Sequence, residues 1–134
     1  MFALSALPLV AAAAAAVAIG YLWYHPRVCG AAWMRFSGMT PEMAERGARH
    51  RHLYMLGGFI AALVVASAMR TLLLDLQISD IAGAARFGAA IFVGFAAPLT
   101  FGSVLWEHRP FTLYLLNAGY WLLALVAMAI TLVV

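Results

Sequence analysis

Charged side chains are scarce in this chain of 134 residues: Asp, Glu, Lys and Arg together make up 10%, and hydrophobic residues make up 66%. A soluble domain carries about 25% charged residues, because its surface must face water. The mean hydropathy of +0.97 reflects the same imbalance. So little charge excludes a water-exposed globular surface, and we expect an integral membrane protein.

Lysine is absent, and all eight basic residues are arginines, which against five acidic residues give a net charge of +3. A basic balance can indicate nucleic-acid binding. Here the arginines lie in short connections between apolar runs, where they serve as topology signals and lipid-headgroup contacts. We therefore expect membrane lipids, and no nucleic acid, as partners. The single cysteine, Cys29, excludes a disulfide within the chain.

Four apolar runs lie at about residues 2–24, 53–74, 83–106 and 111–134. Each approaches or exceeds the roughly 20 residues that a helix needs to cross a bilayer, and each is too long for a barrel strand. Backbone groups in lipid must bond within their own segment, so we expect all four to be helices. The sequence predicts one all-α domain over residues 1–134, a four-transmembrane-helix bundle. The first run lacks the charge pattern of a signal peptide, and we expect a retained span.

The connections differ in charge. The first and third carry six arginines, whereas two arginines and two aspartates lie in or beside the second (Arg27, Arg35, Arg46, Arg49, Arg51 and Arg109; Arg70, Arg86, Asp75 and Asp80). Positively charged loops stay in the cytoplasm. We therefore expect a multi-pass protein of the bacterial inner membrane, with both termini periplasmic and the Arg-rich connection cytoplasmic.

The first connection has helical signals of its own. Thr40 is a candidate N-cap, followed by Pro41 at the first helical position and then Glu42. The pattern predicts a helix that begins here and runs without a break into the second span at Leu53. The preceding stretch "AAWMRFSG" fits a helical or interfacial elbow in the headgroup layer, and an irregular loop is the alternative.

Two spans end in similar sequences, "GYLWYHPRVCG" at Gly20–Gly30 and "GSVLWEHRPF" at Gly102–Phe111. Trp and Tyr prefer the membrane–water boundary and Pro stops a helix, so both stretches are expected helix exits at one depth. Convergent interface chemistry explains the similarity, and a parallel repeat of two helix pairs remains the alternative. The binding candidates are Trp23, His25, Trp106 and His108 at these exits, with Asn117 and Tyr120 in the fourth span.

Small residues recur every four positions on two spans, a spacing that lets helices approach closely in lipid (Gly58, Ala62 and Ala66; Gly94, Pro98 and Gly102). Pro98 should also bend the third span. Asn117, about two turns inside the fourth span, should find an interhelical partner, for which Ser103, Thr100 and Tyr114 are candidates.

Catalytic patterns are missing: no Ser/His/Asp set, phosphate-binding glycine loop or mid-span carboxylate is present. All four histidines fall on the expected cytoplasmic side with Cys29 and Glu107, which makes a metal site the alternative to solvated histidines. His50 and His52, however, are two apart on an expected helix and point in different directions. We therefore expect no metal and no catalytic residue. We expect no cofactor either, unless a bound lipid or quinone serves as one.

The pattern "G-x-L-W-Y-x-P-x-x-x-G-x-x-W-M" from Gly20 to Met34 resembles a bacterial family of small four-span proteins, domain of unknown function 1761. Further matches are "GFxxP" from Gly94, "WExRP" from Trp106 and "NAGYW" from Asn117. The resemblance covers essentially the whole chain and implies a four-span membrane fold, with no established activity and no catalytic residues to carry over. The chain departs from the family pattern at His25, His108 and Cys29.

Three functional classes remain open. We favour a non-catalytic subunit or assembly partner of a larger membrane complex, whose partners are other membrane subunits or further copies of the chain. The alternatives are an oligomeric small-molecule transporter or channel, and a membrane protein or enzyme that binds lipid or quinone at the cytoplasmic boundary.

Overall fold

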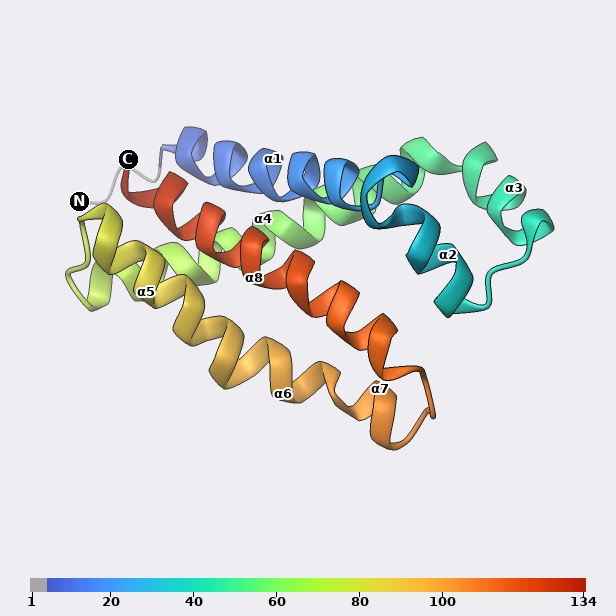
Figure 1. Cartoon of the computed structure of the whole chain (residues 1–134). Helices are drawn as coiled ribbons and strands as arrows, with labels where there is room; N and C mark the ends of the chain where they lie inside the picture. Colours follow the sequence, from blue (N-terminus) through green and yellow to red (C-terminus); the bar gives the residue numbers. More distant parts are fainter. Residues whose placement is uncertain (1–4) are drawn as a thin grey trace.

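A computed structural model describes residues 5–134, and within that range it contains helices and turns but no strand. The elements are α1 (Ala6–Trp23), the π-helical turn η1 (Pro26–Gly30), α2 (Ala31–Ser37), α3 (Pro41–Arg49), α4 (Arg51–Asp75), α5 (Ile81–Ile91), the π-helical turn η2 (Phe92–Ala96), α6 (Ala97–Thr100), α7 (Gly102–Leu105) and α8 (Phe111–Val133). Figure 1 shows their arrangement.

The predicted all-α, four-span fold is confirmed. Among residues 5–134, four helical stretches have the length and composition to cross a membrane: α1, α4, the run Ile81–Leu105 and α8. Their bounds lie within two residues of the predicted ones, except at the start of the first span, where residues 2–4 lie outside the described part of the chain.

Helix starts follow local side-chain chemistry. The hydroxyl of Thr40 accepts a hydrogen bond from the Met43 N–H at 3.2 Å, which confirms the predicted N-cap of α3. The carboxylate of Asp80 does the same for α5, accepting from the Gly83 N–H at 2.7 Å. Each cap satisfies an N–H group that the first helical turn leaves without a partner.

α8 is the central helix of the bundle and contacts α1, α4 and α5. α1 and α5 begin, and α4 and α8 end, on one side of the molecule, which we call the packed end (Figure 1). The connection from α1 to α4 and the turn from α7 to α8 lie together on the opposite side, the open end (Figure 1). This arrangement agrees with the predicted pairing of the first and third connections.

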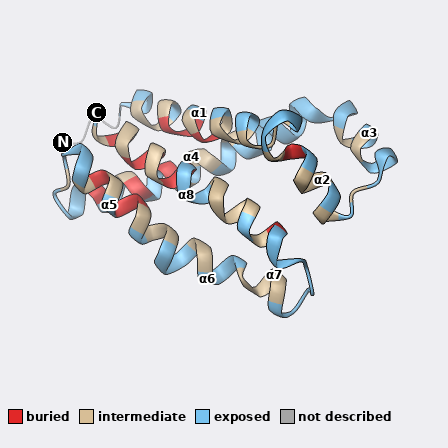
Figure 2. Ribbon diagram, in the orientation of Figure 1, coloured by how far each residue is buried: buried red, intermediate tan, exposed pale blue. Residues whose placement is uncertain are grey.

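The hydrophobic core occupies the packed end (Figure 2). Its buried members come from the first part of α1, the second part of α4, α5 and the second part of α8, and many are alanines (Ala12, Ala16, Ala66, Met69, Leu73, Ala84, Phe87, Ala124, Leu125, Met128, Ala129 and Leu132). Small side chains let helix backbones approach closely, and dispersion contacts between them replace the hydrophobic drive that lipid removes.

The helices α5 and α8 approach each other very closely at Gly88. A Cβ at this position would lie 2.7 Å from the carbonyl oxygen of Leu125 and 2.8 Å from the Cα of Val126. Only glycine leaves room for the α8 backbone here.

The predicted packing residues are placed unevenly. Ala66 is buried, and Ala62 packs partly against the core. By contrast, among residues 5–134 no neighbouring atom lies within 4 Å of the position that a Cβ would take at Gly58 or Gly94, and at Gly102 the nearest is in the Trp106 ring, at 3.8 Å. Pro98 is exposed. That Gly58 and Gly94 pack closely against a helix therefore stays a prediction, and the helix would have to belong to another chain.

The third span is interrupted before Pro98. In η2 the Ala97 N–H bonds to the carbonyl of Phe92, five residues back, where an α-helix would use Val93. A π-turn inserts one extra residue into the helix, and Pro98 lacks the N–H that would continue the regular ladder. A second interruption at Phe101 separates α6 from α7.

The prediction of one continuous helix from Thr40 into the second span is wrong. His50 has φ −112° and ψ 19°, so α3 ends at Arg49 and α4 starts at Arg51. Gly47 in the last turn of α3 weakens the helix locally, and the His50 N–H bonds back to the Gly47 carbonyl at 3.2 Å. The elbow before α3 is helical, as one of the two predictions had it. α2 ends at Ser37, and the next residue, Gly38, has a φ of 72°, the left-handed conformation that commonly ends a helix.

Candidate functional site

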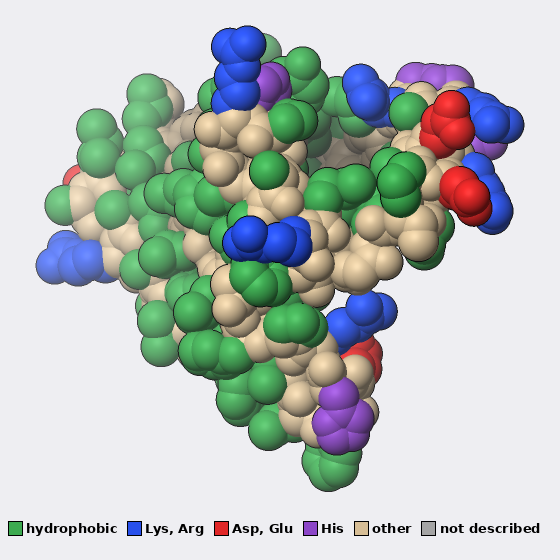
Figure 3. All heavy atoms as spheres, turned by 45° about the vertical axis from the view of Figure 1, so that its right-hand side comes forward, with side chains coloured by type: hydrophobic (Ala, Val, Ile, Leu, Met, Phe, Trp, Pro, Cys, Tyr) green, Lys and Arg blue, Asp and Glu red, His purple; other side chains and the backbone are tan. Residues whose placement is uncertain are grey.

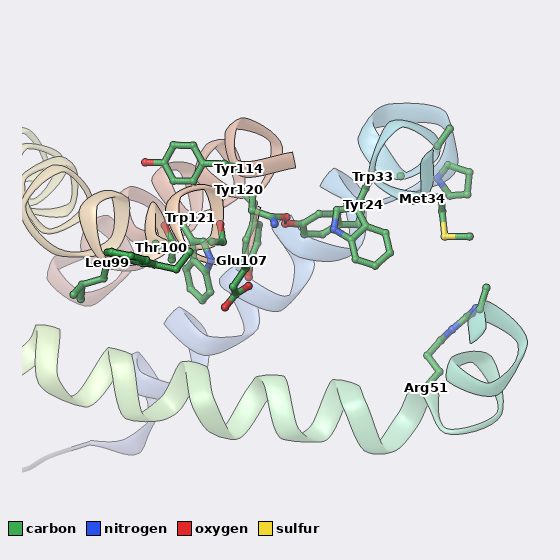
Figure 4. Close-up of a pocket in the computed structure, with 18 residues that line it drawn as sticks. Tyr24, Trp33, Met34, Arg51, Leu99, Thr100, Glu107, Tyr114, Tyr120 and Trp121 are labelled. Carbon is green, nitrogen blue, oxygen red and sulfur yellow. The ribbon is translucent and has the colours of Figure 1, made fainter. Parts of the chain in front are cut away.

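The helices spread apart at the open end and leave a groove of about 1170 Å³ between the end of α1, α2, the start of α4, α6–α7 and α8. Figure 3 shows the corresponding hollow between two projections that carry charged and histidine side chains. The groove is lined largely by rings: Tyr24, Trp33, Trp106, Tyr114, Tyr120 and Trp121. Figure 4 shows how most of these side chains enter it.

Four of these rings form a continuous wall, which we call the aromatic row. Trp33 and Tyr24 meet edge to face with centroids 6.1 Å apart, Tyr24 and Tyr120 lie 5.5 Å apart, and Tyr120 and Trp121 lie 5.0 Å apart. Tilted and edge-to-face pairs of this kind contribute about 0.5–1.5 kcal/mol each beyond the area they bury. The row joins α2, the end of α1 and α8 into one surface.

The row is positioned by hydrogen bonds between α1 and α8. The Trp23 Nε1–H donates to the Leu116 carbonyl at 2.9 Å, the Tyr24 hydroxyl donates to Asn117 Oδ1 at 2.7 Å, and the Tyr120 hydroxyl donates to the Ala16 carbonyl at 3.1 Å. All three join residues far apart in the sequence, so they fix the two helices in register.

Asn117 has the interhelical partner that was expected, but the partner is Tyr24 and none of the three candidates named from the sequence. Two of those candidates are engaged with backbone instead: the Thr100 hydroxyl donates to the Ala96 carbonyl at 2.6 Å, and the Tyr114 hydroxyl donates to the Ala97 carbonyl at 2.9 Å. Both satisfy carbonyls beside the interruption in the third span.

The two helix exits place their predicted residues differently. Trp23 packs against Gly119 of α8 and does not line the groove. His25 Nδ1 accepts from the Arg27 N–H at 3.2 Å and so caps η1, outside the groove. His108 is exposed in the α7–α8 turn with a φ of 53°, also outside the groove.

Of the six predicted binding residues, the structure brings Trp106, Asn117 and Tyr120 together in the groove. Four further rings of the groove, those of Tyr24, Trp33, Tyr114 and Trp121, were not among the predicted binding residues, although they belong to aromatic stretches near the span ends. Their positions relative to one another depend on how α1 crosses α8, and the sequence does not carry that information. Across residues 5–134 no three His, Cys, Asp or Glu side chains gather as a metal site would need.

Polar groups in the groove are few. Arg51 of α4 and Glu107 after α7 stand on opposite sides of it (Figure 4). Asn117, Thr100 and Ser103 add neutral polar groups. An aromatic cavity with a few separated polar groups is typical of a site for a ligand that is partly apolar and partly polar.

Comparison with known proteins identifies a family over nearly the whole chain. The family model described as a protein of unknown function (DUF1761) matches residues 7–133. No curated protein and no solved structure matches the chain.

Proposed function

The chain belongs to DUF1761, a family of unknown function, and we propose that it binds a membrane amphiphile in the groove at the open end. The observation that supports this is the groove itself, about 1170 Å³ in volume and walled by the aromatic row. Tyr and Trp rings combine an apolar face with a polar edge, which suits the boundary between lipid tails and headgroups.

The surroundings of the groove favour an occupant that enters from the bilayer. Leu99 and Trp106 line the groove yet are 77% and 83% exposed, so the groove opens on the side of α6 and α7. The first half of α4 also presents exposed apolar side chains, among them Leu53, Leu56 and Ile60. An apolar chain in this groove stays in contact with apolar surface along its length.

We propose the same orientation that the sequence predicts. The open end carries six of the eight arginines, and Asp75 and Asp80 lie at the packed end. The positive-inside rule then places the open end in the cytoplasm of a bacterial inner membrane and both termini in the periplasm.

Native mass spectrometry from mild detergent tests the binding function. A monomer that retains an added mass in the range of a lipid or quinone supports it. Recovery of the chain without a bound amphiphile, even after incubation with a total lipid extract, would overturn it. A homo-oligomer would indicate the transporter hypothesis instead.

A role as assembly partner of a membrane complex is our second proposal. The observation that favours it is the outward placement of Gly57, Gly58 and Gly94: within the described part of the chain, no neighbouring atom lies within 4 Å of the position that a Cβ would take at any of them. Small residues on an exposed helix face allow another helix to approach closely. Stable co-purification with a second membrane protein, lost when Gly58 is replaced by a bulky residue, tests this proposal.

A further inference from the structure

A second cavity of about 380 Å³ adjoins the groove. Trp33, Ser103, Glu107 and Asn117 line both spaces, so the wall between them consists of these side chains, which we call the shared wall. Beyond the shared wall, the second cavity is lined by Arg109 and by residues of α2 and α3.

Arg109 is held across this second cavity. Its backbone N–H donates to the Ser103 carbonyl at 3.0 Å, and its Nη1 donates to the Ser37 carbonyl at the end of α2, at 3.4 Å. The second contact uses one of the five N–H donors of the guanidinium group, and the others remain for a ligand. The carboxylate of Glu107 lines the same small space, so the cavity holds one positioned cation and one anion.

Two polar groups of the shared wall fit a donor-bearing cation, and a third fits an anion. Asn117 Oδ1 already accepts from the Tyr24 hydroxyl, so Asn117 offers only its amide N–H donors, which suit a phosphate oxygen. The Glu107 carboxylate and the Ser103 hydroxyl oxygen both accept hydrogen bonds, and the Trp33 ring can attract a cation to its face.

We propose that the shared wall recognises the headgroup of an aminophospholipid, a refinement that rests on the proposed amphiphile-binding function. The primary ammonium group donates to Glu107 and Ser103, the phosphate binds Arg109, and the acyl chains lie in the groove along the aromatic row. Charge complementarity carries the assignment: a zwitterionic headgroup matches one carboxylate and one guanidinium, whereas a purely anionic headgroup meets the unfavourable charge of Glu107.

Choline lipids provide the discriminating comparison. They carry the same phosphate and the same charges, but a quaternary ammonium has no N–H to donate. Delipidated protein is incubated with phosphatidylethanolamine, phosphatidylcholine or phosphatidylglycerol of identical acyl chains, and the retained lipid is measured by native mass spectrometry. We expect the ethanolamine lipid to be retained about tenfold more than the choline lipid, the ratio expected for one charge-assisted hydrogen bond.

Glu107→Gln removes the charge and keeps the size of the side chain. We expect it to lower retention of the ethanolamine lipid to the level of the choline lipid. Glu45→Gln, an exposed carboxylate of α3 that lines neither cavity, is the matched control and should keep the wild-type ratio.

Three outcomes would overturn the inference: equal retention of the two zwitterionic lipids by wild type, an unchanged ratio in Glu107→Gln, or preferential retention of phosphatidylglycerol. If lipid is retained without headgroup preference, only this inference fails. If no lipid is retained at all, the proposed function fails with it.

Discussion

The indole ring of Trp23 occupies the space that a side chain at Gly119 would need: its Cζ2 atom lies 2.7 Å from the position of a Cβ there. The same ring donates its N–H to the Leu116 carbonyl, one turn earlier on α8. The end of α1 is therefore seated on a notch in α8 that exists only because residue 119 is glycine.

Gly119→Ala should displace this ring and weaken the contact between α1 and α8. Overpacking of this kind costs about 1–3 kcal/mol. The expected result is a lower apparent unfolding temperature in detergent, measured by intrinsic fluorescence. Gly57→Ala is the control, because among the described residues no neighbouring atom lies within 4 Å of its Cβ position. Equal unfolding temperatures for the two variants would show that the close contact between the Trp23 ring and Gly119 does not stabilise the fold.

Tyr24→Phe should remove one hydrogen bond and keep the ring in the aromatic row. The change leaves Asn117 Oδ1 without its donor and should cost about 0.5–1.5 kcal/mol. Unfolding followed in detergent against wild type measures the loss. Tyr21→Phe, on an exposed ring of the same helix, should be neutral, and a similar loss there would show that the Tyr24–Asn117 bond has no particular weight.

Trp106→Ala should reduce amphiphile binding without unfolding the chain, because this ring lines the groove yet is 83% exposed. Truncation of an aromatic contact costs about 1–2 kcal/mol of binding free energy, roughly a five- to thirtyfold loss of affinity. Titration of the lipid that native mass spectrometry identifies gives the ratio. Phe95→Ala, an exposed ring that does not line the groove, should bind as wild type does.

Replacing Arg46, Arg49 and Arg51 with glutamate should disturb the orientation of the protein in the membrane. The substitution reverses the charge of the connection that the positive-inside rule retains in the cytoplasm. Reporter fusions at both termini measure the side on which each lies. Reporters that do not move would show that other residues set the topology.

The four spans could be predicted because hydropathy over about 20 residues depends on composition alone. The helix contacts could not, since in lipid the outward faces are as apolar as the buried ones and give no periodic signal. Gly88 and Gly119 meet a neighbour at close range, while Gly58 and Gly94 face open space within the described chain, and nothing in their sequence surroundings separates the two pairs. The break at His50 was not predicted, because the strong helix-start signals at Thr40 were given more weight than the low helix propensity of Gly47.

The candidate site was predicted only in part, because its assembly depends on contacts between helices that the sequence does not show. From their positions in the sequence, Trp106 was recognisable as a residue of the membrane boundary and Asn117 as a polar residue inside a span. That Asn117 pairs with Tyr24, and that Trp33 reaches the same groove, depends on the tight η1 turn, in which the Gly30 N–H bonds to the His25 carbonyl five residues back. A π-turn has no reliable sequence signal.

The extra residue in η2 sets the rotation of everything that follows it on the third span. Each residue of an α-helix turns the chain by about 100°. If the same residues formed an unbroken α-helix without this wider turn, α6 and α7 would be turned about a quarter of the way around their axis. Leu99, Ser103 and Trp106 would then point elsewhere, and a different surface of the third span would face α8.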